Sequence, residues 1–273
     1  MNQYYICYPN GKFKALTFSY DDGKKADRRL ISIFNKYGLK GTFHLNGGLF
    51  PEESGDQERI PKSEVKELYA GHEVAGHTYT HPTIARCPIE KVADEIILDR
   101  RALEELVYYP VQGFSYPNGS YNENIKSLLP LLGIEYARVV GNSNNFELPM
   151  DWFEWKASCH HNAKLMELGR QFVELHKSQY LYLMYVWGHS YEFDGDNNWD
   201  LIEEFAELVS KHEKDIWFVT NIEFKRYMED AKRIVFSSNG KQVFNPNYQS
   251  IWIRINQKLI ELTPGMNQLE GNS

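Results

Sequence analysis

Two adjacent carboxylates end an apolar, aromatic run in the segment TFSYDDG, residues 17–23. Neighbouring side chains of a strand point to opposite faces, so Asp21 and Asp22 need not have the same role. One carboxylate can bind a cation while the other stays free to accept a proton. A solvated turn or a helix N-cap is the simpler alternative, because Asp22-Gly23 before a helix is ordinary capping chemistry.

Two histidines four residues apart, His77 and His81 in the segment HTYTH, can supply nitrogen ligands to the same ion. With one carboxylate they would complete the three protein ligands of an open catalytic metal site. Pro82 stops a helix here, so we expect a loop. Histidines in this spacing are more often surface or core residues than metal ligands. However, neither a structural role for the histidines nor helix capping by Asp22 explains why both TFSYDDG and HTYTH follow predicted strands.

The polar clusters all follow predicted strands. The active site of a parallel α/β barrel is built from the C-terminal ends of its strands, so these clusters would converge on one rim. The clusters and the strands that precede them are Asp21-Asp22 after 14–20, HTYTH (77–81) after 72–76, YPNG (116–119) after 111–115, and His189 after 181–188.

Short β-rich runs alternate with helical patterns along most of the chain. Seven or so such units without an internal repeat predict a barrel of parallel strands ringed by helices, with an open doubly wound sheet as the alternative. Strands are expected at 14–20, 41–46, 72–76, 111–116, 136–140, 181–187 and 215–220, and helices at 24–37, 63–70, 88–107, 123–132 and 198–212.

The pattern changes near Arg233 to short strands separated by SSNG and NPN turns. This change predicts a barrel domain over residues 1–230 and a small β-rich C-terminal extension over 231–273. The last residues, 266–273, are expected to form a loose terminus.

Composition limits the partners and the compartment. The 273-residue chain has a net charge of -7 and a pI near 5.8, which excludes nucleic acid or an anionic membrane as a natural partner, since both need basic surface. A neutral substrate or a cationic product fits better. Cys7, Cys87 and Cys159 are widely spaced and odd in number, which indicates reduced thiols. With no signal-peptide pattern at the start and no long apolar run, we expect a soluble cytoplasmic protein, unless a leader has been removed.

The ordered motifs resemble those of the polysaccharide deacetylases, a NodB-like group of carbohydrate esterases. TFSYDDG is similar to the family's first motif, HTYTH to the second, YPNG to the third, and WGH at 187–189 to the last. The resemblance covers about residues 14–225. It implies a distorted (β/α) barrel, one divalent metal ion and hydrolytic removal of an acetyl group, usually from an N-acetylated sugar. Zinc is the metal expected first, with cobalt or nickel as alternatives.

The resemblance assigns a role to each of five residues. It makes Asp21 the general base, and it makes Asp22 a metal ligand together with His77 and His81. It makes His189 the general acid. A base and an acid of different pKa should give a bell-shaped pH profile.

The resemblance also implies contacts with the substrate. A backbone N–H after the proline of the third motif, here that of Asn118, would complete the oxyanion site, and Tyr116 lies beside it in the same motif. Trp187 is a candidate for stacking on a pyranose face, although aromatic residues near a barrel rim often belong to the core. The other candidates for stacking are Tyr79, Trp152, Trp155 and Tyr191.

Two positions depart from the family pattern. The third motif usually carries an arginine that helps to orient the base, and Ser115 stands in its place. The fourth motif, an Asp-Trp pair, has only a loose counterpart in Asp151 and Trp152. The contacts that support the base therefore cannot be inferred from the motifs.

Other polar residues keep two interpretations each. His160 and His161 could line the cleft or be structural. Glu192 and Asp194 could bind sugar hydroxyls or the product ammonium, or could belong to a solvated loop. His44 ends a strand and could face the cleft, whereas His72 and Cys159 are expected to support structure.

Three functions remain open from the sequence. The leading one is a metal-dependent deacetylase of an N-acetylated sugar or short oligosaccharide. The second is an enzyme of the same fold that acts on an O-acetyl ester or a non-sugar amide, which the change at Ser115 makes more plausible. The third is a non-catalytic barrel that binds saccharides, although such a protein would not need the ligands, the base and the acid together.

Overall fold

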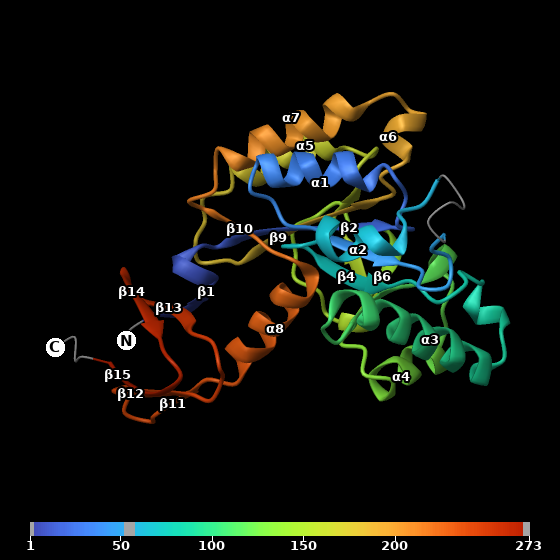
Figure 1. The fold of residues 1–273 in the computed structure, drawn as a ribbon. Coiled ribbons are helices and arrows are strands. Elements are labelled where there is room, and N and C mark those ends of the chain that lie inside the picture. Colours follow the sequence, from blue (N-terminus) through green and yellow to red (C-terminus); the bar gives the residue numbers. More distant parts are fainter. Residues whose placement is uncertain (1–2, 52–57, 270–273) are drawn as a thin grey trace.

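The computed structural model describes residues 3–51 and 58–269. In this part of the chain, eight parallel strands form a nearly closed barrel with helices around it (Figure 1). The predicted barrel is therefore confirmed, and the open doubly wound sheet is not formed. The barrel order is β7 (Trp155–Ala157), β6 (Tyr136–Asn142), β5 (Gly113–Ser115), β4 (Glu73–Gly76), β3 (Thr42–Leu45), β2 (Lys14–Asp21), β9 (Tyr182–Gly188) and β8 (Cys159–His160). The short strand β10 (Ile216–Phe218) pairs with the start of β2.

The helices cover the outside of the barrel. Helices α1, α5 and α7 lie together on one side, and α3 and α4 lie side by side on another (Figure 1). Their bounds are α1 Asp27–Lys36, α2 Lys62–Leu68, α3 Ile89–Val107, α4 Glu123–Leu131, α5 Leu165–Val173, α6 Glu192–Gly195, α7 Trp199–Ser210 and α8 Asn221–Lys232. The sequence pattern missed β7 and β8, because two or three residues are too few to show a periodicity. None of the helices in the described ranges is long and apolar enough to cross a membrane.

Strand β2 explains why a buried strand can end in a carboxylate. All eight of its residues are buried. One face packs against the helices, where the Phe18 ring lies 4.5 Å from that of Phe34 and 6.1 Å from that of Phe205. The alternate residues carry polar groups, and Thr17 donates a hydrogen bond of 2.7 Å to Asn221. The period of two puts Asp21 on the polar face with Thr17.

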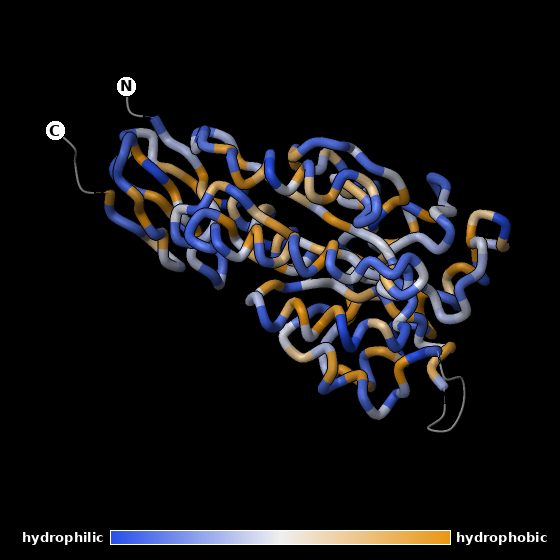
Figure 2. The backbone as a smooth tube through the Cα atoms, turned by 90° about the horizontal axis from the view of Figure 1, so that it is seen from above, coloured by the Kyte–Doolittle hydropathy of each residue, from blue (hydrophilic) through white to orange (hydrophobic). Residues whose placement is uncertain are grey.

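The β-rich extension contains two three-stranded antiparallel sheets and lies at one end of the barrel (Figure 1). One sheet joins β1 (Tyr4–Cys7), β13 (Ile251–Ile255) and β14 (Lys258–Leu262), and the other joins β11 (Val235–Phe236), β12 (Gln242–Asn245) and β15 (Gly265–Gln268). Because β1 pairs with β13, the two sides of the predicted boundary at 230/231 share a sheet. Figure 2 shows both chain ends leaving the molecule at this extension.

The predicted loose terminus over 266–273 is wrong for its first residues. All four residues of β15 pair in register with β12, from Gln242 opposite Gln268 to Asn245 opposite Gly265. These backbone hydrogen bonds fix the segment in the sheet. The part of the prediction that falls on residues 270–273 lies outside the described residues.

Candidate active site

The polar clusters lie at the C-terminal ends of the barrel strands, as predicted. Asp21 is the last residue of β2, and Asp22 follows it with φ of 84°. The loop with HTYTH follows β4, Ser115 ends β5, and His189 follows β9. Parallel strands bring these four ends to one rim of the barrel.

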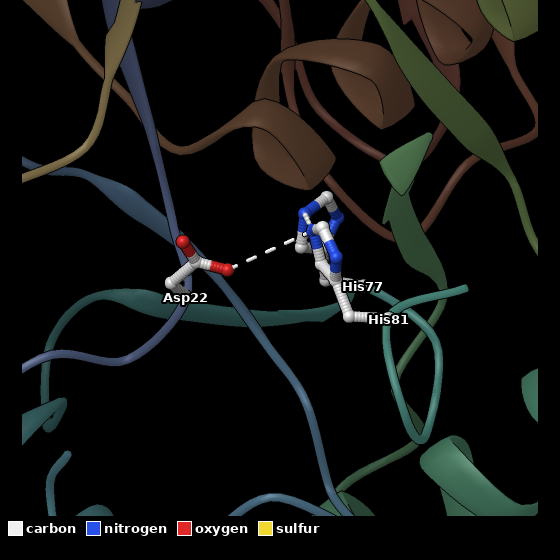
Figure 3. A group of neighbouring side chains, drawn as sticks. All are labelled: Asp22, His77 and His81. Atoms are coloured by element: carbon white, nitrogen blue, oxygen red, sulfur yellow. Dashed lines mark hydrogen bonds and ion pairs between the residues drawn. The ribbon is translucent and has the colours of Figure 1, made fainter. Parts of the chain in front are cut away.

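Asp22, His77 and His81 form a group with the geometry of metal ligands (Figure 3). One ligand atom from each lies within 4.8 Å of the others. The Nε2 atoms of His77 and His81 are 3.1 Å apart, and Nε2 of His81 is 3.9 Å from Oδ1 of Asp22. The segment is a loop, as predicted, and Thr78 and His81 have φ of 67° and 61°.

Contacts around His77 leave its Nε2 free to bind a cation. Burial lowers the pKa of His77 to about 4, so its imidazole is neutral near pH 7. Its Nδ1 lies 2.8 Å from the carbonyl oxygen of Ser115, which accepts the ring proton. The lone pair of Nε2 then faces His81 and Asp22. A histidine oriented in this way, together with a second histidine and a carboxylate, is a donor set suited to zinc and similar divalent ions.

Asp99 of α3 holds the backbone of the loop that contains His77, a role that the sequence analysis missed. Its carboxyl group accepts backbone N–H groups from His77 at 2.9 Å and from Gly47 at 2.6 Å. Burial raises the pKa of Asp99 to about 8. A helix residue far along the chain thus positions the backbone of a proposed metal ligand, which no local motif could indicate.

Asp21 is buried and held by groups from two neighbouring strands. Ser115 of β5 donates a hydrogen bond of 3.2 Å to its Oδ1, and Nη2 of Arg138 on β6 contacts its Oδ2. Nε2 of His77 lies 3.8 Å from Oδ2. Burial alone would raise the pKa of Asp21, but Arg138 and His77 outweigh it and hold the pKa well below its usual range. Asp21 is therefore ionised, as a proton acceptor must be.

Arg138 supplies the guanidinium that the motifs seemed to lack. Ser115 and Arg138 are register partners across β5 and β6, so the arginine stands one strand away from the position where the family carries it. Its guanidinium also lies 4.6 Å from the ring centroid of Trp187. The small side chain of Ser115 is hydrogen-bonded to Asp21 beside it, and both groups reach the same carboxylate. The contacts that hold the Asp21 carboxylate, which could not be inferred from the motifs, are therefore present in the structure.

His189 is paired with Glu192, three residues further along the chain. Nδ1 of His189 is 3.3 Å from Oε1 of Glu192, whose Oε2 accepts the backbone N–H of His189 at 3.0 Å. Burial disfavours the charged imidazole, but Glu192 and the negative charge of Asp21 outweigh it and raise the pKa of His189. A raised pKa favours the protonated imidazole, which is the form that a proton donor needs.

Glu192 also binds His160 and His161, whose Nε2 atoms lie 3.1 and 3.3 Å from its Oε2. The three residues could hold a second metal ion by distance alone. However, Nδ1 of His160 accepts the backbone N–H of Asn162 at 3.2 Å. The proton of a neutral His160 is therefore on Nε2, which donates to Glu192 and is not a metal ligand. The cluster is a set of histidines around one carboxylate, beside the acid.

The remaining predicted residues lie close to this rim. Asn118 has φ of 56° in the short 3₁₀ turn Pro117–Gly119. Tyr116 is buried and donates its hydroxyl to the carbonyl of Phe153 at 2.9 Å. Its backbone N–H and carbonyl are hydrogen-bonded to Arg138 and Gly119, so the predicted substrate contact falls to Asn118 instead. Trp187 is 8% exposed and donates a hydrogen bond of 3.0 Å to Asn142.

Several other predicted residues have structural positions. Asp151 pairs with Lys126 at 2.7 Å and caps the 3₁₀ turn Trp152–Glu154. Trp155 is buried, and the indole of Trp152 donates to Glu229. Cys159 and His72, which were expected to support structure, are buried. His44, which could have faced the cleft, is buried as well.

A cleft of about 710 Å³ lies beside the proposed metal ligands. Asp22 and His81 form part of its wall, and Tyr191 forms another part. Tyr191 is 40% exposed and its hydroxyl is hydrogen-bonded to Asp22. Tyr191 therefore lies in the wall of the cleft, next to a proposed metal ligand.

Comparisons with known proteins agree with the motifs. The family model described as "Polysaccharide deacetylase" matches residues 7–137. A peptidoglycan-N-acetylglucosamine deacetylase from Bacillus cereus is 28% identical over 112 residues, which are 40% of this chain and 38% of that protein. The aligned region covers less than half the length of each curated relative that it matches.

Solved structures show the same fold. The Xyl-CE4 domain of a multidomain xylanase, from the hindgut metagenome of Trinervitermes trinervoides, has a TM-score of 0.53 and 18% identity, covering 81% of this chain and 92% of that one. A CE4-family pseudoenzyme from Bacillus anthracis has a TM-score of 0.50 and 16% identity, covering 81% and 68%. At these identities the likeness concerns the fold alone, and the same fold occurs with and without activity.

Proposed function

We propose, from its membership of the polysaccharide deacetylase family, that this chain is a metal-dependent hydrolase that removes an acetyl group from an N-acetylated sugar or short oligosaccharide. The observation that carries the proposal is the convergence of Asp22, His77 and His81 beside the buried, ionised Asp21. A structural cluster would not need three metal-ligand side chains and a separate proton acceptor at one rim.

Asp22, His77 and His81 would hold a divalent ion, zinc foremost and cobalt or nickel as alternatives. When bound, such an ion polarises an acyl oxygen and acidifies water. Asp21 then accepts the proton of the attacking water, and Arg138 and Ser115 keep its carboxylate in place. The backbone of Asn118 is the candidate for stabilising the developing oxyanion.

His189 completes the reaction on the other side of the site. An amine is a poor leaving group, so the departing nitrogen needs a proton. Glu192 accepts the proton on Nδ1 of His189, which leaves Nε2 as the atom that donates to the nitrogen. The raised pKa of His189 and the lowered pKa of Asp21 give the acid and the base opposite protonation states at the same pH.

Two other functions use the same groups. An O-acetyl ester or a non-sugar amide would need the same base, acid and oxyanion contact. A non-catalytic saccharide-binding barrel is represented in this fold by the Bacillus anthracis pseudoenzyme. The presence of the base, the acid and the ligand set together supports catalysis over binding alone.

The first test is metal content together with acetate release. Purified wild type, reconstituted with zinc, cobalt or nickel, should contain about one ion per chain by mass spectrometry and should release acetate from N-acetylated sugars. His77→Ala should lose both, whereas His160→Ala, which removes a histidine of the neighbouring cluster, should keep the ion. Acetate from esters or small amides alone would favour the second function, and saccharide binding without release would favour the third.

A further inference from the structure

Among the residues that the structure describes, three cationic and three anionic side chains line the cleft beside the proposed metal ligands, although the whole chain carries a net charge of -7. The cations are Lys24, Lys25 and Arg59, and the carboxylates are Asp22, Glu58 and Asp194. A divalent ion held by Asp22, His77 and His81 would leave the lining with a net positive charge. Local charge in a cleft, more than the total charge, decides which ligands are attracted.

The carboxylates of the cleft already have partners. Glu58 forms an ion pair with Lys24 at 3.3 Å. Asp194 accepts the indole N–H of Trp199 at 2.8 Å. Asp22 belongs to the proposed ligand set and accepts the hydroxyl of Tyr191.

Two of the cations have no such partner. Lys25 is exposed, and no carboxylate of the described residues lies within ion-pair distance of it or of Arg59. Arg59 donates through Nη1 to the carbonyl oxygen of Asp22 and, at 3.3 Å, to Oδ1 of Asn46. A guanidinium has five N–H donors in a planar fork, so these contacts leave donors for an oxyanion.

The position of Arg59 places the free charge close to the reacting group. Its guanidinium contacts the backbone of Asp22, which is itself a proposed metal ligand. An anion bound to this guanidinium would therefore lie on the sugar that carries the acetyl group or on the next one along. The cleft volume of about 710 Å³ has room for a substituted saccharide unit.

We propose that this cleft selects N-acetylated sugars that carry an anionic oxygen substituent, a carboxylate or a phosphate, and that Lys25 and Arg59 bind that substituent. The inference rests on the proposed deacetylase function and names its substrate class. It differs from the neutral substrate that the net charge predicts, because the described carboxylates of the cleft already have partners whereas Lys25 and Arg59 have no carboxylate partner among the described residues.

The test compares three disaccharide probes of one length: neutral N,N'-diacetylchitobiose, a carboxylated N-acetyl disaccharide and a phosphorylated one. Acetate release gives kcat and KM, and calorimetry gives Kd, for the metal-loaded wild type, Lys25→Ser and Lys214→Ser. Lys214 is an exposed lysine in the turn before β10, at the opposite end of the barrel. Its substitution is the matched control for the loss of one positive charge.

Wild type should favour an anionic probe over the neutral one by about tenfold in kcat/KM, mainly through KM, since a charge-assisted hydrogen bond contributes about 1.5 kcal/mol or more. Lys25→Ser should reduce this ratio by roughly three- to tenfold, Lys214→Ser should leave it unchanged, and added salt should narrow it. The anionic probe that gives the higher kcat/KM relative to the neutral probe shows whether the cleft prefers a carboxylate or a phosphate.

Equal ratios for all probes in wild type, or the same ratio in Lys25→Ser, would overturn the inference while leaving a working deacetylase. If no probe releases acetate, the proposed function fails, and calorimetry still decides the inference. Tighter binding of an anionic probe that weakens in Lys25→Ser would then support it, and equal or absent binding of all three probes would refute it.

Discussion

The segment that the family model matches and the part of the chain beyond it contribute differently to the candidate site. Residues 7–137 contain the proposed ligands and base, Asp22, His77, His81 and Asp21. The two charged groups that hold Asp21 and His189 lie outside that segment: Arg138 is the first residue after it, and Glu192 follows much later, whereas Ser115 lies inside it. The proposed ligands and base occupy motif positions, whereas Arg138 and Glu192, which contact Asp21 and His189, come from outside the motifs.

This difference follows from the geometry that each role needs. Metal ligands must converge within a few ångströms, so short motifs at the ends of strands fix them. A residue that positions a base needs only to reach one carboxylate, and any neighbouring strand can deliver it. Arg138 does so from β6, in register with Ser115 of β5. A missing motif residue is therefore weak evidence that its function is missing.

The largest effect within the base assembly is expected for Asp21→Asn. The amide cannot accept the proton of water, so kcat should fall by roughly 10²–10⁴ while metal content stays at about one ion per chain. Measuring acetate release and metal content on the same preparation separates the base from the ligands. Full activity of Asp21→Asn would show that the base assignment is wrong, and loss of the ion would make Asp21 part of the ligand set.

A smaller but still large effect is expected for Arg138→Met. Loss of the guanidinium leaves the buried Asp21 without its cation, which should lower the free energy of unfolding by about 3 kcal/mol or more. The rate should fall by roughly 10–100-fold with the metal retained. Arg138→Lys keeps the charge but not the planar fork, and it should recover part of both losses.

A double mutant sharpens this result. If Arg138 acts through Asp21, the variant Asp21→Asn with Arg138→Met should be no slower than Asp21→Asn alone. Rate losses that multiply would show that Arg138 has a separate role, for example through its stacking on Trp187. Thermal denaturation of each single variant shows whether reduced folding explains the loss.

The sequence predicted the barrel, the rim and the metal-ligand group, because each is encoded locally. Strand periodicity, a loop enforced by Pro82 and polar residues at the ends of strands are visible in short windows. The contacts of Asp99 with His77 and of Arg138 with Asp21 join positions 22 and 117 residues apart, and no local pattern marks them. The strand β1 was also missed, because it pairs with β13 at the far end of the chain.

The smallest effect, and the one that separates the two histidine groups most cleanly, is expected for Glu192→Gln. Glu192 raises the pKa of His189, so removing its charge should lower that pKa. The acid must be protonated to act, so activity should be lost at a lower pH than in wild type. The basic limb of the pH profile should move to lower pH, while the rate on the acidic side of the profile changes less. The ion should be retained, since Glu192 does not belong to the group Asp22, His77 and His81 that is proposed to bind it. Asp200→Asn, at an exposed position in the first turn of α7, is the matched control and should leave the limb in place. If the basic limb does not move in Glu192→Gln, His189 is not the acid whose titration limits the rate. If metal content falls in Glu192→Gln, the metal ion is bound by His160, His161 and Glu192, and not by Asp22, His77 and His81.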